Sequence, residues 1–188
     1  MFWRYFPIAH AVVFGLLAVT LRSYLAGRMK LTFLRGQGPR DFVARCFYLG
    51  IPLVDMIYLV FYTGTGNPGP LLLDDESLRW LGLLMMVLGP AWVVYAQASM
   101  GRSWAMGVVD DGELMTGGPF AISRHPIYLG VRIIMLGQLL VIGSWPVFVV
   151  WVLCEVLAQI QVRFEEEAMH ARYGQRYAEY CARVRRWL

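Results

Sequence analysis

The chain has 188 residues, of which 58% are hydrophobic and only 16% are charged, and its mean hydropathy is +0.51. Soluble domains are usually less than half apolar and roughly a quarter charged, so this composition excludes an ordinary soluble domain and indicates an integral membrane protein. The basic side chains, nearly all Arg, are divided among loops and form no single basic face, which excludes nucleic acid as the expected partner.

Five apolar runs predict about five transmembrane helices in one all-α domain that spans residues 1–188. The runs cover residues 6–24, 42–62, 78–98, 127–142 and 147–162. The last two are short for a hydrocarbon layer of ~30 Å, which takes ~20 residues. Only residues 143–146, "GSWP", separate them, and Gly and Pro are typical of tight turns, so these two runs predict a helical hairpin. Residues 1–98 would hold three spans, and residues 99–188 a loop, the hairpin and a tail.

The charges of the loops predict the orientation in the membrane. Basic residues gather in loop 27–41, in loop 99–126 and in tail 163–188, whereas loop 63–77 carries only acidic ones. Segments rich in Arg and Lys stay in the cytoplasm, so we expect the C-terminus in the cytoplasm and the N-terminus outside, in a cytoplasmic (inner) membrane. Loop 99–126 and the tail then lie on the same side and could build one site.

The tail after Val162 changes character, because charged residues replace the apolar run. Met169, Tyr173, Tyr177 and Tyr180 recur at a spacing typical of an amphipathic helix that is broken near Gly174. One interpretation of this pattern is an anchor that lies in the membrane interface, with Arg toward the lipid headgroups.

Three charged residues, Asp55, Arg132 and Glu155, fall inside predicted spans. Charges in lipid are costly, so they face protein or water and often mark a functional site. Arg132 and Glu155 could form a pair that locks the hairpin, or Arg132 could bind a substrate headgroup. Asp55 could bond a neighbouring helix, or bind a cationic or amine group of the substrate.

Two polar stretches mark the ends of the predicted hairpin. "SRHPIYLG" opens its first helix, where Pro126 is suited to the first helical position, and "RFEEE" follows its second helix. Because the ends of a hairpin are neighbours, we expect donors, carboxylates and an aromatic ring to meet at the membrane surface. The residues concerned are Arg124, His125 and Tyr128 on one side, and Arg163, Glu165 and Glu166 on the other. Taken singly, each is explained by a solvated helix turn or a backbone hydrogen bond; taken jointly, they favour a ligand site.

These stretches resemble the isoprenylcysteine carboxyl methyltransferase family and its phospholipid methyltransferase relatives. The family pattern G-P-Y-x-x-x-R-H-P-x-Y-x-G corresponds to "GPFAISRHPIYLG", in which Phe120 replaces the first tyrosine. The pattern E-E-x-x-L-x-x-x-F-G-x-x-Y-x-x-Y corresponds to residues 165–180, in which Met169 and Tyr173 replace leucine and phenylalanine. The resemblance covers about residues 101–186.

The resemblance implies S-adenosylmethionine as the methyl donor, and a lipid-like or small hydrophobic acceptor that carries a carboxylate, thiol or amine, with membrane lipids around it. It implies a cofactor site of Leu114, Met115, Phe120, Arg124, His125, Pro126, Ile127, Tyr128, Glu165 and Glu166. Catalytic roles are expected for Arg163, Glu166 and His125, and acceptor binding for Arg132 and Asp55. A carboxylate acceptor needs no base, whereas an amine or thiol needs one, for which Glu166 or His125 is a candidate.

Two other classes of function remain open from the sequence. Some sterol-reductase-like membrane enzymes that use NADPH also end in a hairpin with an R-H-P-x-Y-x-G stretch. In those, Asn is expected after the proline and Glu after the glycine, where this chain has Ile127 and Val131. A non-enzymatic membrane scaffold is the other alternative, and it leaves the paired motifs unexplained. No metal is expected, because the three cysteines lack the spacing of metal ligands.

Overall fold

The computed structural model describes residues 69–100 and 114–188, together with isolated positions between residues 9 and 56. The predicted spans at residues 6–24 and 42–62, and the candidate residue Asp55, lie outside the described residues. Five elements follow in chain order: α4 (Glu76–Met100), the 3-10 helix η2 (Gly118–Ala121), α5 (Pro126–Ile142), α6 (Trp145–Tyr173) and α7 (Gln175–Arg183). This part of the chain is therefore all-helical.

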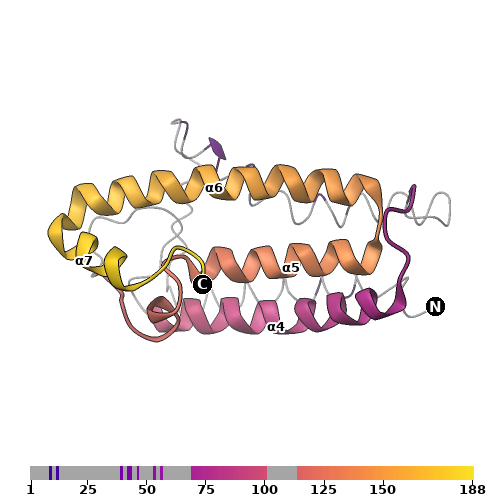
Figure 1. The fold of residues 1–188 in the computed structure, drawn as a ribbon, viewed down its shortest axis with the longest axis horizontal. Helices are drawn as coiled ribbons and strands as arrows, with labels where there is room; N and C mark the ends of the chain where they lie inside the picture. Colours follow the sequence, from indigo (N-terminus) through magenta and orange to yellow (C-terminus); the bar gives the residue numbers. More distant parts are fainter. Residues whose placement is uncertain are drawn as a thin grey trace.

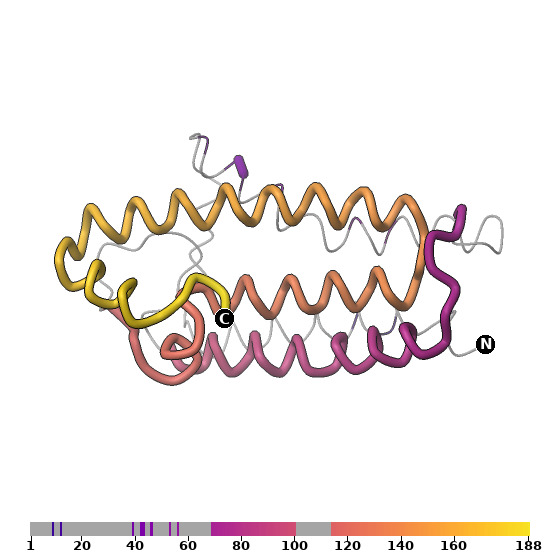
Figure 2. The backbone as a smooth tube through the Cα atoms, viewed as in Figure 1, coloured from indigo at the N-terminus to yellow at the C-terminus, as the bar shows by residue number. Residues whose placement is uncertain are grey.

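The three long helices lie lengthwise beside one another, with α5 between α4 and α6 (Figure 1). Helix α7 folds back at the end of α6, and the C-terminus returns to the space between α6 and the beginning of α5 (Figure 2). The chain thus brings three segments to one end of the bundle: the beginning of α5, the last turns of α6 and the C-terminal tail.

Glycines allow α4 and α5 to approach closely. A Cβ on Gly82 would lie 2.7 Å from the carbonyl oxygen of Gly137, and a Cβ on Gly89 would lie 2.6 Å from Cγ1 of Ile134. Opposite Gly89, a Cβ on Gly130 would lie 3.2 Å from the Gly89 carbonyl oxygen. Small residues at such crossings let helix backbones meet in membrane proteins, so this pair forms a rigid support for the beginning of α5.

The turn between α5 and α6 is fixed by backbone hydrogen bonds. Gly143 ends α5 with a φ of 66°, a conformation that glycine adopts without strain. Its carbonyl oxygen accepts hydrogen bonds from the N–H groups of Leu72 (2.7 Å) and Leu73 (3.0 Å), and the Trp145 N–H donates to the Pro70 carbonyl (3.0 Å). The predicted hairpin is confirmed, and the segment before α4 is hydrogen-bonded to the turn between α5 and α6.

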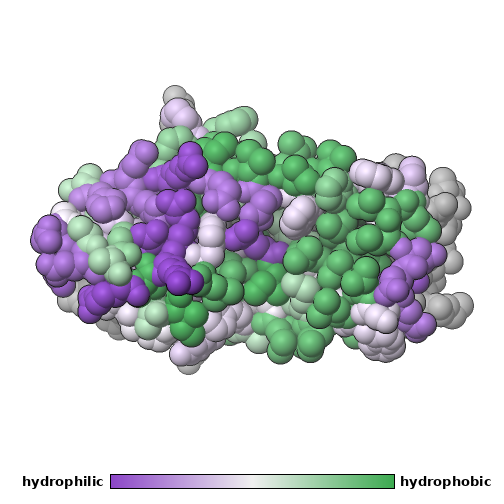
Figure 3. Space-filling view, in the orientation of Figure 1, coloured by the Kyte–Doolittle hydropathy of each residue, from purple (hydrophilic) through white to green (hydrophobic). Residues whose placement is uncertain are grey.

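Two of the described helices, α4 and α6, are long and apolar enough to cross a membrane, and α5 is a shorter apolar helix of 17 residues. Helix α6 continues for three turns beyond Val162, where its apolar run ends, so its last residues lie beyond the membrane-spanning part. Figure 3 shows a similar division: hydrophilic residues gather at the end of the molecule that carries α7 and reach toward the middle, and hydrophobic residues cover most of the remaining face, apart from a smaller hydrophilic patch near the opposite end.

The helix of the tail forms as the sequence predicts, but its aromatic side chains are buried. The chain breaks at Gly174, where α6 ends and α7 begins. Tyr177 and Tyr180 are almost fully buried, and the Tyr180 hydroxyl donates a hydrogen bond of 2.6 Å to the Phe120 carbonyl. This face of α7 therefore packs against protein, and α7 fixes η2 beside the end of the bundle.

Candidate active site

The first wall of the site is the beginning of α5. Pro126 is the first residue of the helix, and its carbonyl oxygen accepts a hydrogen bond of 2.8 Å from Trp92 Nε1 on α4. His125 stands at the position before it, and its backbone N–H donates to Ser123 Oγ at 3.2 Å. The N–H of the first helical residue has no partner within the helix, and proline has no N–H, so Pro126 suits this position. His125 therefore lies directly before the first turn of α5.

The second wall is the last part of α6. Glu165 lies four residues after Gln161, so both side chains project from the same face of the helix. Gln161 Nε2 donates to Glu165 Oε1 at 3.3 Å. Glu166 follows directly and is buried, with a side-chain exposure of 12% against 24% for Glu165.

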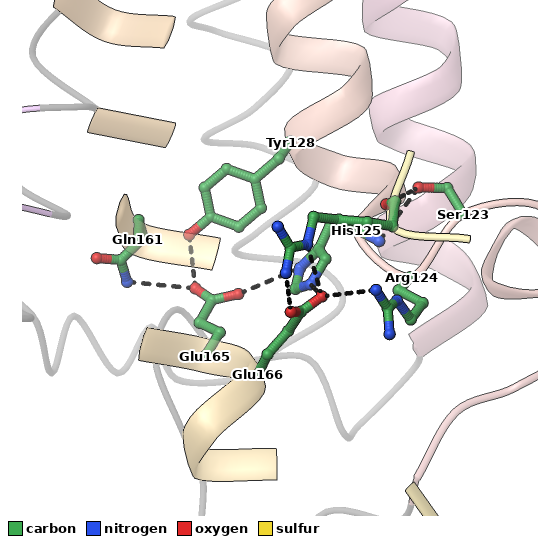
Figure 4. Close-up of polar contacts among 8 residues, drawn as sticks. Ser123, Arg124, His125, Tyr128, Gln161, Glu165 and Glu166 are labelled. Atoms are coloured by element: carbon green, nitrogen blue, oxygen red, sulfur yellow. Dashed lines mark hydrogen bonds and ion pairs between the residues drawn. The ribbon is translucent and has the colours of Figure 1, made fainter. Parts of the chain in front are cut away.

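The two walls meet through direct polar contacts, which Figure 4 shows. The Tyr128 hydroxyl donates to Glu165 Oε1 at 2.6 Å. The His125 ring lies between the two carboxylates, with Nε2 at 3.3 Å from Glu166 Oε1 and Nδ1 at 3.7 Å from Glu165 Oε2. Four of the expected neighbours at the open end of the hairpin, His125, Tyr128, Glu165 and Glu166, are thus in contact.

Cationic groups surround Glu166. Arg124 Nη2 lies 3.2 Å from its Oε1, and Arg186 holds both oxygens, with Nε at 3.0 Å from Oε1 and Nη2 at 2.5 Å from Oε2. Burial by itself raises the pKa of the Glu166 carboxyl. Hydrogen bonds from His125 and Arg186, and the charge of Arg124, outweigh burial and lower that pKa to about 2. Glu166 is therefore an ionised, fully engaged carboxylate.

His125 is the buried titratable group between the carboxylates. Only 7% of the residue is exposed, and burial by itself lowers the pKa of the imidazole. The neighbouring carboxylates of Glu165 and Glu166 outweigh burial, and the pKa of His125 is raised above its ordinary value of 6.5. The site therefore favours a protonated imidazole over a wider pH range than water does.

The two glutamates, which the sequence treats alike, stand in different surroundings. Glu165 accepts hydrogen bonds from two neutral donors, Tyr128 and Gln161, and it is the more exposed of the two. Glu166 is neutralised by two arginines. The ionisable neighbour of Glu165 among the described residues is the His125 ring, whose Nδ1 lies 3.7 Å from Oε2.

The C-terminal tail supplies a third wall that the motifs did not predict. Arg186 contacts Glu166, and its carbonyl oxygen accepts a hydrogen bond of 3.0 Å from Ser123 Oγ. The Trp187 ring lies 6.1 Å from the His125 ring, and Arg132 lies over it at 4.2 Å. Gln161 is a further contact residue outside both motifs, and its only signal in the sequence is a polar side chain at the end of an apolar run.

A second ion pair lies deeper between α5 and α6. Arg132 Nε donates to Glu155 Oε2 at 2.8 Å, and Gln159 Nε2 donates to Glu155 Oε1 at 3.3 Å. The sequence-based pairing of Arg132 with Glu155 is confirmed. Because Glu155 already neutralises Arg132, a substrate headgroup that binds Arg132 would have to compete with this carboxylate.

The remaining predicted site residues divide into two groups. Pro126 is buried and Ile127 half-buried at the beginning of α5, Phe120 is buried in η2, and Leu114 and Met115 are half-buried in the segment before η2. Arg163, by contrast, is exposed on α6, and it forms no ion pair with the described residues of the site. The structure therefore does not bring Arg163 to the two glutamates.

Comparisons with known proteins agree with this geometry. The phospholipid methyltransferase family matches residues 78–176. The fold is similar to that of the eukaryotic intramembrane Ras methyltransferase ICMT (isoprenylcysteine carboxyl methyltransferase), with a TM-score of 0.59 and 18% sequence identity. That match covers 87% of this chain and 58% of the other, so this chain spans little more than half the length of that enzyme. A search of the curated proteins gives no match.

Proposed function

The chain belongs to the phospholipid methyltransferase family, and from this membership we propose that it transfers the methyl group of S-adenosylmethionine to a lipid-like or small hydrophobic acceptor. The transfer would take place at the cytosolic end of α5 and α6. This assignment makes the chain a membrane methyltransferase, and it disfavours both the reductase and the scaffold that the sequence left open.

The observation that carries the proposal is the state of Glu165. This carboxylate lies just beyond the apolar part of α6, has neutral hydrogen-bond donors and keeps part of its surface exposed. S-adenosylmethionine brings a sulfonium and an ammonium group, both positive, from the cytosol. A partly exposed carboxylate at the membrane surface that neither arginine of the site pairs with suits such a donor, and the acceptor would arrive from the bilayer.

Two buried polar atoms test whether the site fits the amino-acid end of the cofactor. Gln161 Oε1 and Arg124 Nε have no hydrogen-bond partner among the residues that the structure describes. Buried polar groups are normally paired, so one free acceptor and one free donor beside the glutamates need an explanation. An ammonium group suits Gln161 and Glu165, and a carboxylate suits Arg124, so the residues present fit this cofactor.

When bound, S-adenosylmethionine supplies an electrophilic methyl group. The protein then has mainly to align the acceptor, and alignment alone supplies several kcal/mol. Glu166 is a poor base at neutral pH, because its pKa is about 2. For an amine or thiol acceptor we therefore assign the proton to the neutral form of His125, which is the main form only above its raised pKa, and a carboxylate acceptor needs no base.

The membrane placement that we propose follows the loop charges. Five spans, with the N-terminus outside and the C-terminus in the cytoplasm, bring loop 99–126, the last turns of α6 and the tail to the cytosolic surface. Asp55 stays a candidate for acceptor binding, outside the described residues. The acceptor itself is assigned only by its class, a hydrophobic molecule with a carboxylate, thiol or amine, or a phospholipid.

The test is transfer of an isotope-labelled methyl group. The purified protein in liposomes is supplied with labelled S-adenosylmethionine and, separately, with a prenylcysteine carboxylate, a fatty thiol and phosphatidylethanolamine. We expect label in one of the lipid extracts, and less of it with the Glu165→Gln variant when S-adenosylmethionine is supplied near the dissociation constant of the parent. Oxidation of NADPH by the same preparation, without transfer of label to any acceptor class, would contradict the proposal.

A further inference from the structure

Arg186, in the C-terminal tail beyond the family match, forms part of the site. We propose that Arg186 is a positioning residue, which fixes Glu166 and through it the side chains of Arg124 and His125. The inference rests on the proposed function, because it assigns Arg186 a role in that same site. Neither motif includes this residue, because the second motif ends at Tyr180, and the family match ends at residue 176.

The geometry of the contact is that of a forked pair. Arg186 Nε donates to Glu166 Oε1 at 3.0 Å, and Arg186 Nη2 donates to Oε2 at 2.5 Å. Two parallel bonds between guanidinium and carboxylate fix the orientation of both planes, which a single point charge does not do. The carboxylate of Glu166 is thus held in one orientation.

The two oxygens of Glu166 have different partners. Oε1 faces Arg124 at 3.2 Å and His125 Nε2 at 3.3 Å. For Oε2, the contact found among the described residues is with Arg186. Without Arg186, Oε2 loses this donor and the carboxylate can rotate away from the beginning of α5. Arg186 therefore orients the oxygen that Arg124 and His125 share.

The tail is tied down on both sides of the guanidinium. The Arg124 backbone N–H donates to the Arg185 carbonyl at 3.1 Å, and Ser123 Oγ donates to the Arg186 carbonyl at 3.0 Å. The next residue, Trp187, lies under the Arg132 guanidinium at 4.2 Å, in a cation–π contact. These contacts join the tail to the residues that begin α5, so Arg186 enters the site at a defined place.

The charged and titratable groups around Glu166 come from three segments. Arg124 and His125 face it from the beginning of α5, Arg186 from the tail and Tyr177 from α7. Burial raises the pKa of Tyr177 well above its ordinary value, so this phenol stays neutral at working pH. Removal of Arg186 takes away one of the groups that hold the Glu166 pKa low, and the carboxyl then takes up a proton at a higher pH.

The test compares three variants of the full chain in detergent: Arg186→Gln, Arg186→Lys and the control Arg185→Gln. Arg185 is the neighbouring arginine, and its side chain is exposed. The dissociation constant of S-adenosylmethionine is measured by calorimetry from pH 5 to 8, and thermal unfolding checks that each variant is folded. The control removes the same charge from the same tail.

We expect Arg186→Gln to weaken binding by roughly tenfold, the effect of losing charge-assisted hydrogen bonds, and more strongly at the acid end of the range. Arg186→Lys should restore part of the affinity, because it keeps the charge without the fork. Arg185→Gln should bind as the parent does. If Arg186→Gln fails to fold, the inference is tested by comparing the dissociation constants of Arg186→Lys and of the control Arg185→Gln.

Two results would overturn the inference while the proposed function stands. One is a parent and an Arg186→Gln variant that bind with equal affinity at every pH. The other is equal, pH-independent weakening in Arg186→Gln and Arg186→Lys, which is the result of a purely structural role. A parent that does not bind S-adenosylmethionine at all would contradict the proposed function itself, and this inference with it.

Discussion

The Tyr128 hydroxyl donates a hydrogen bond of 2.6 Å to Glu165 Oε1 and so joins the first turn of α5 to the polar end of α6. This bond engages one oxygen of Glu165, whereas both oxygens of the neighbouring Glu166 are held by Arg186. Adjacent carboxylates of the same motif therefore have separable roles: Glu165 is available to a ligand, and Glu166 holds three segments of the chain together.

The first prediction separates these two roles by substitution. Glu165→Gln should weaken binding of S-adenosylmethionine about tenfold with little loss of stability, because it removes a charge that the two arginines of the site do not pair with. Glu166→Gln should lower the free energy of unfolding by about 2 kcal/mol, because it leaves Arg124 and Arg186 without their carboxylate. Calorimetry and thermal unfolding in detergent measure the two effects, with the exposed Glu167→Gln as control. Equal effects of the two variants on both measurements would contradict the assignment.

The second prediction concerns pH. The raised pKa of His125 adds stability that is complete below pH 6.5 and is lost as the pH rises through the raised value. The lowered pKa of Glu166 adds stability that is complete above pH 4.5 and is lost as the pH falls toward about 2. Thermal unfolding should therefore show a plateau between these limits. In His125→Gln the alkaline decline should flatten, and an unchanged decline would show that His125 does not cause it.

The third prediction tests whether the deeper ion pair is structural. Arg132→Met should destabilise the protein by about 2 kcal/mol, because it leaves Glu155 unpaired between two helices. The double variant Arg132→Met, Glu155→Leu should be close to the parent in stability, since it removes both charges. If the pair only locks the hairpin, the double variant also keeps methyl transfer. Loss of transfer in a stable double variant would instead give Arg132 the acceptor-binding role that the sequence left open.

The fourth prediction concerns the support beneath the site. Gly89→Ala should destabilise the protein by about 1–3 kcal/mol, because its Cβ would lie 2.6 Å from Ile134 Cγ1. Gly117→Ala is the control, since no atom of the described residues lies within 4 Å of a Cβ there and its φ of −102° suits alanine. Thermal unfolding compares the two. A Gly89→Ala variant as stable as the control would mean that α4 and α5 separate without cost.

The sequence predicts the helices well where apolar runs meet clear breakers. Helix α5 begins at Pro126 and ends before Gly143, as the run 127–142 and its Gly-Pro punctuation indicate. The fifth apolar run ends at Val162 and α6 continues to Tyr173, so this run and the first part of the predicted tail helix form one helix, which ends at the predicted break near Gly174. Hydropathy shows where lipid-compatible residues stop, whereas a helix continues until a breaker such as Gly174 ends it.

Part of the site could also be predicted from the local pattern of the sequence. The hairpin places His125 and Tyr128 beside Glu165 and Glu166, and local pattern is sufficient to see this. The contact of Arg186 with Glu166 depends on the tail folding back after α7, and no periodicity in the sequence encodes that return. The role of Arg163 was expected from its place in "RFEEE" and from the resemblance, but a place in a motif does not fix where a long side chain ends, and Arg163 is exposed.

The most direct test of the central claim is calorimetric titration of the purified parent protein in detergent with S-adenosylmethionine, with NADPH titrated in parallel. Our account predicts saturable binding of S-adenosylmethionine and no binding of NADPH. Saturable binding of NADPH alone, or no heat from either ligand in a protein that unfolds cooperatively, would contradict it.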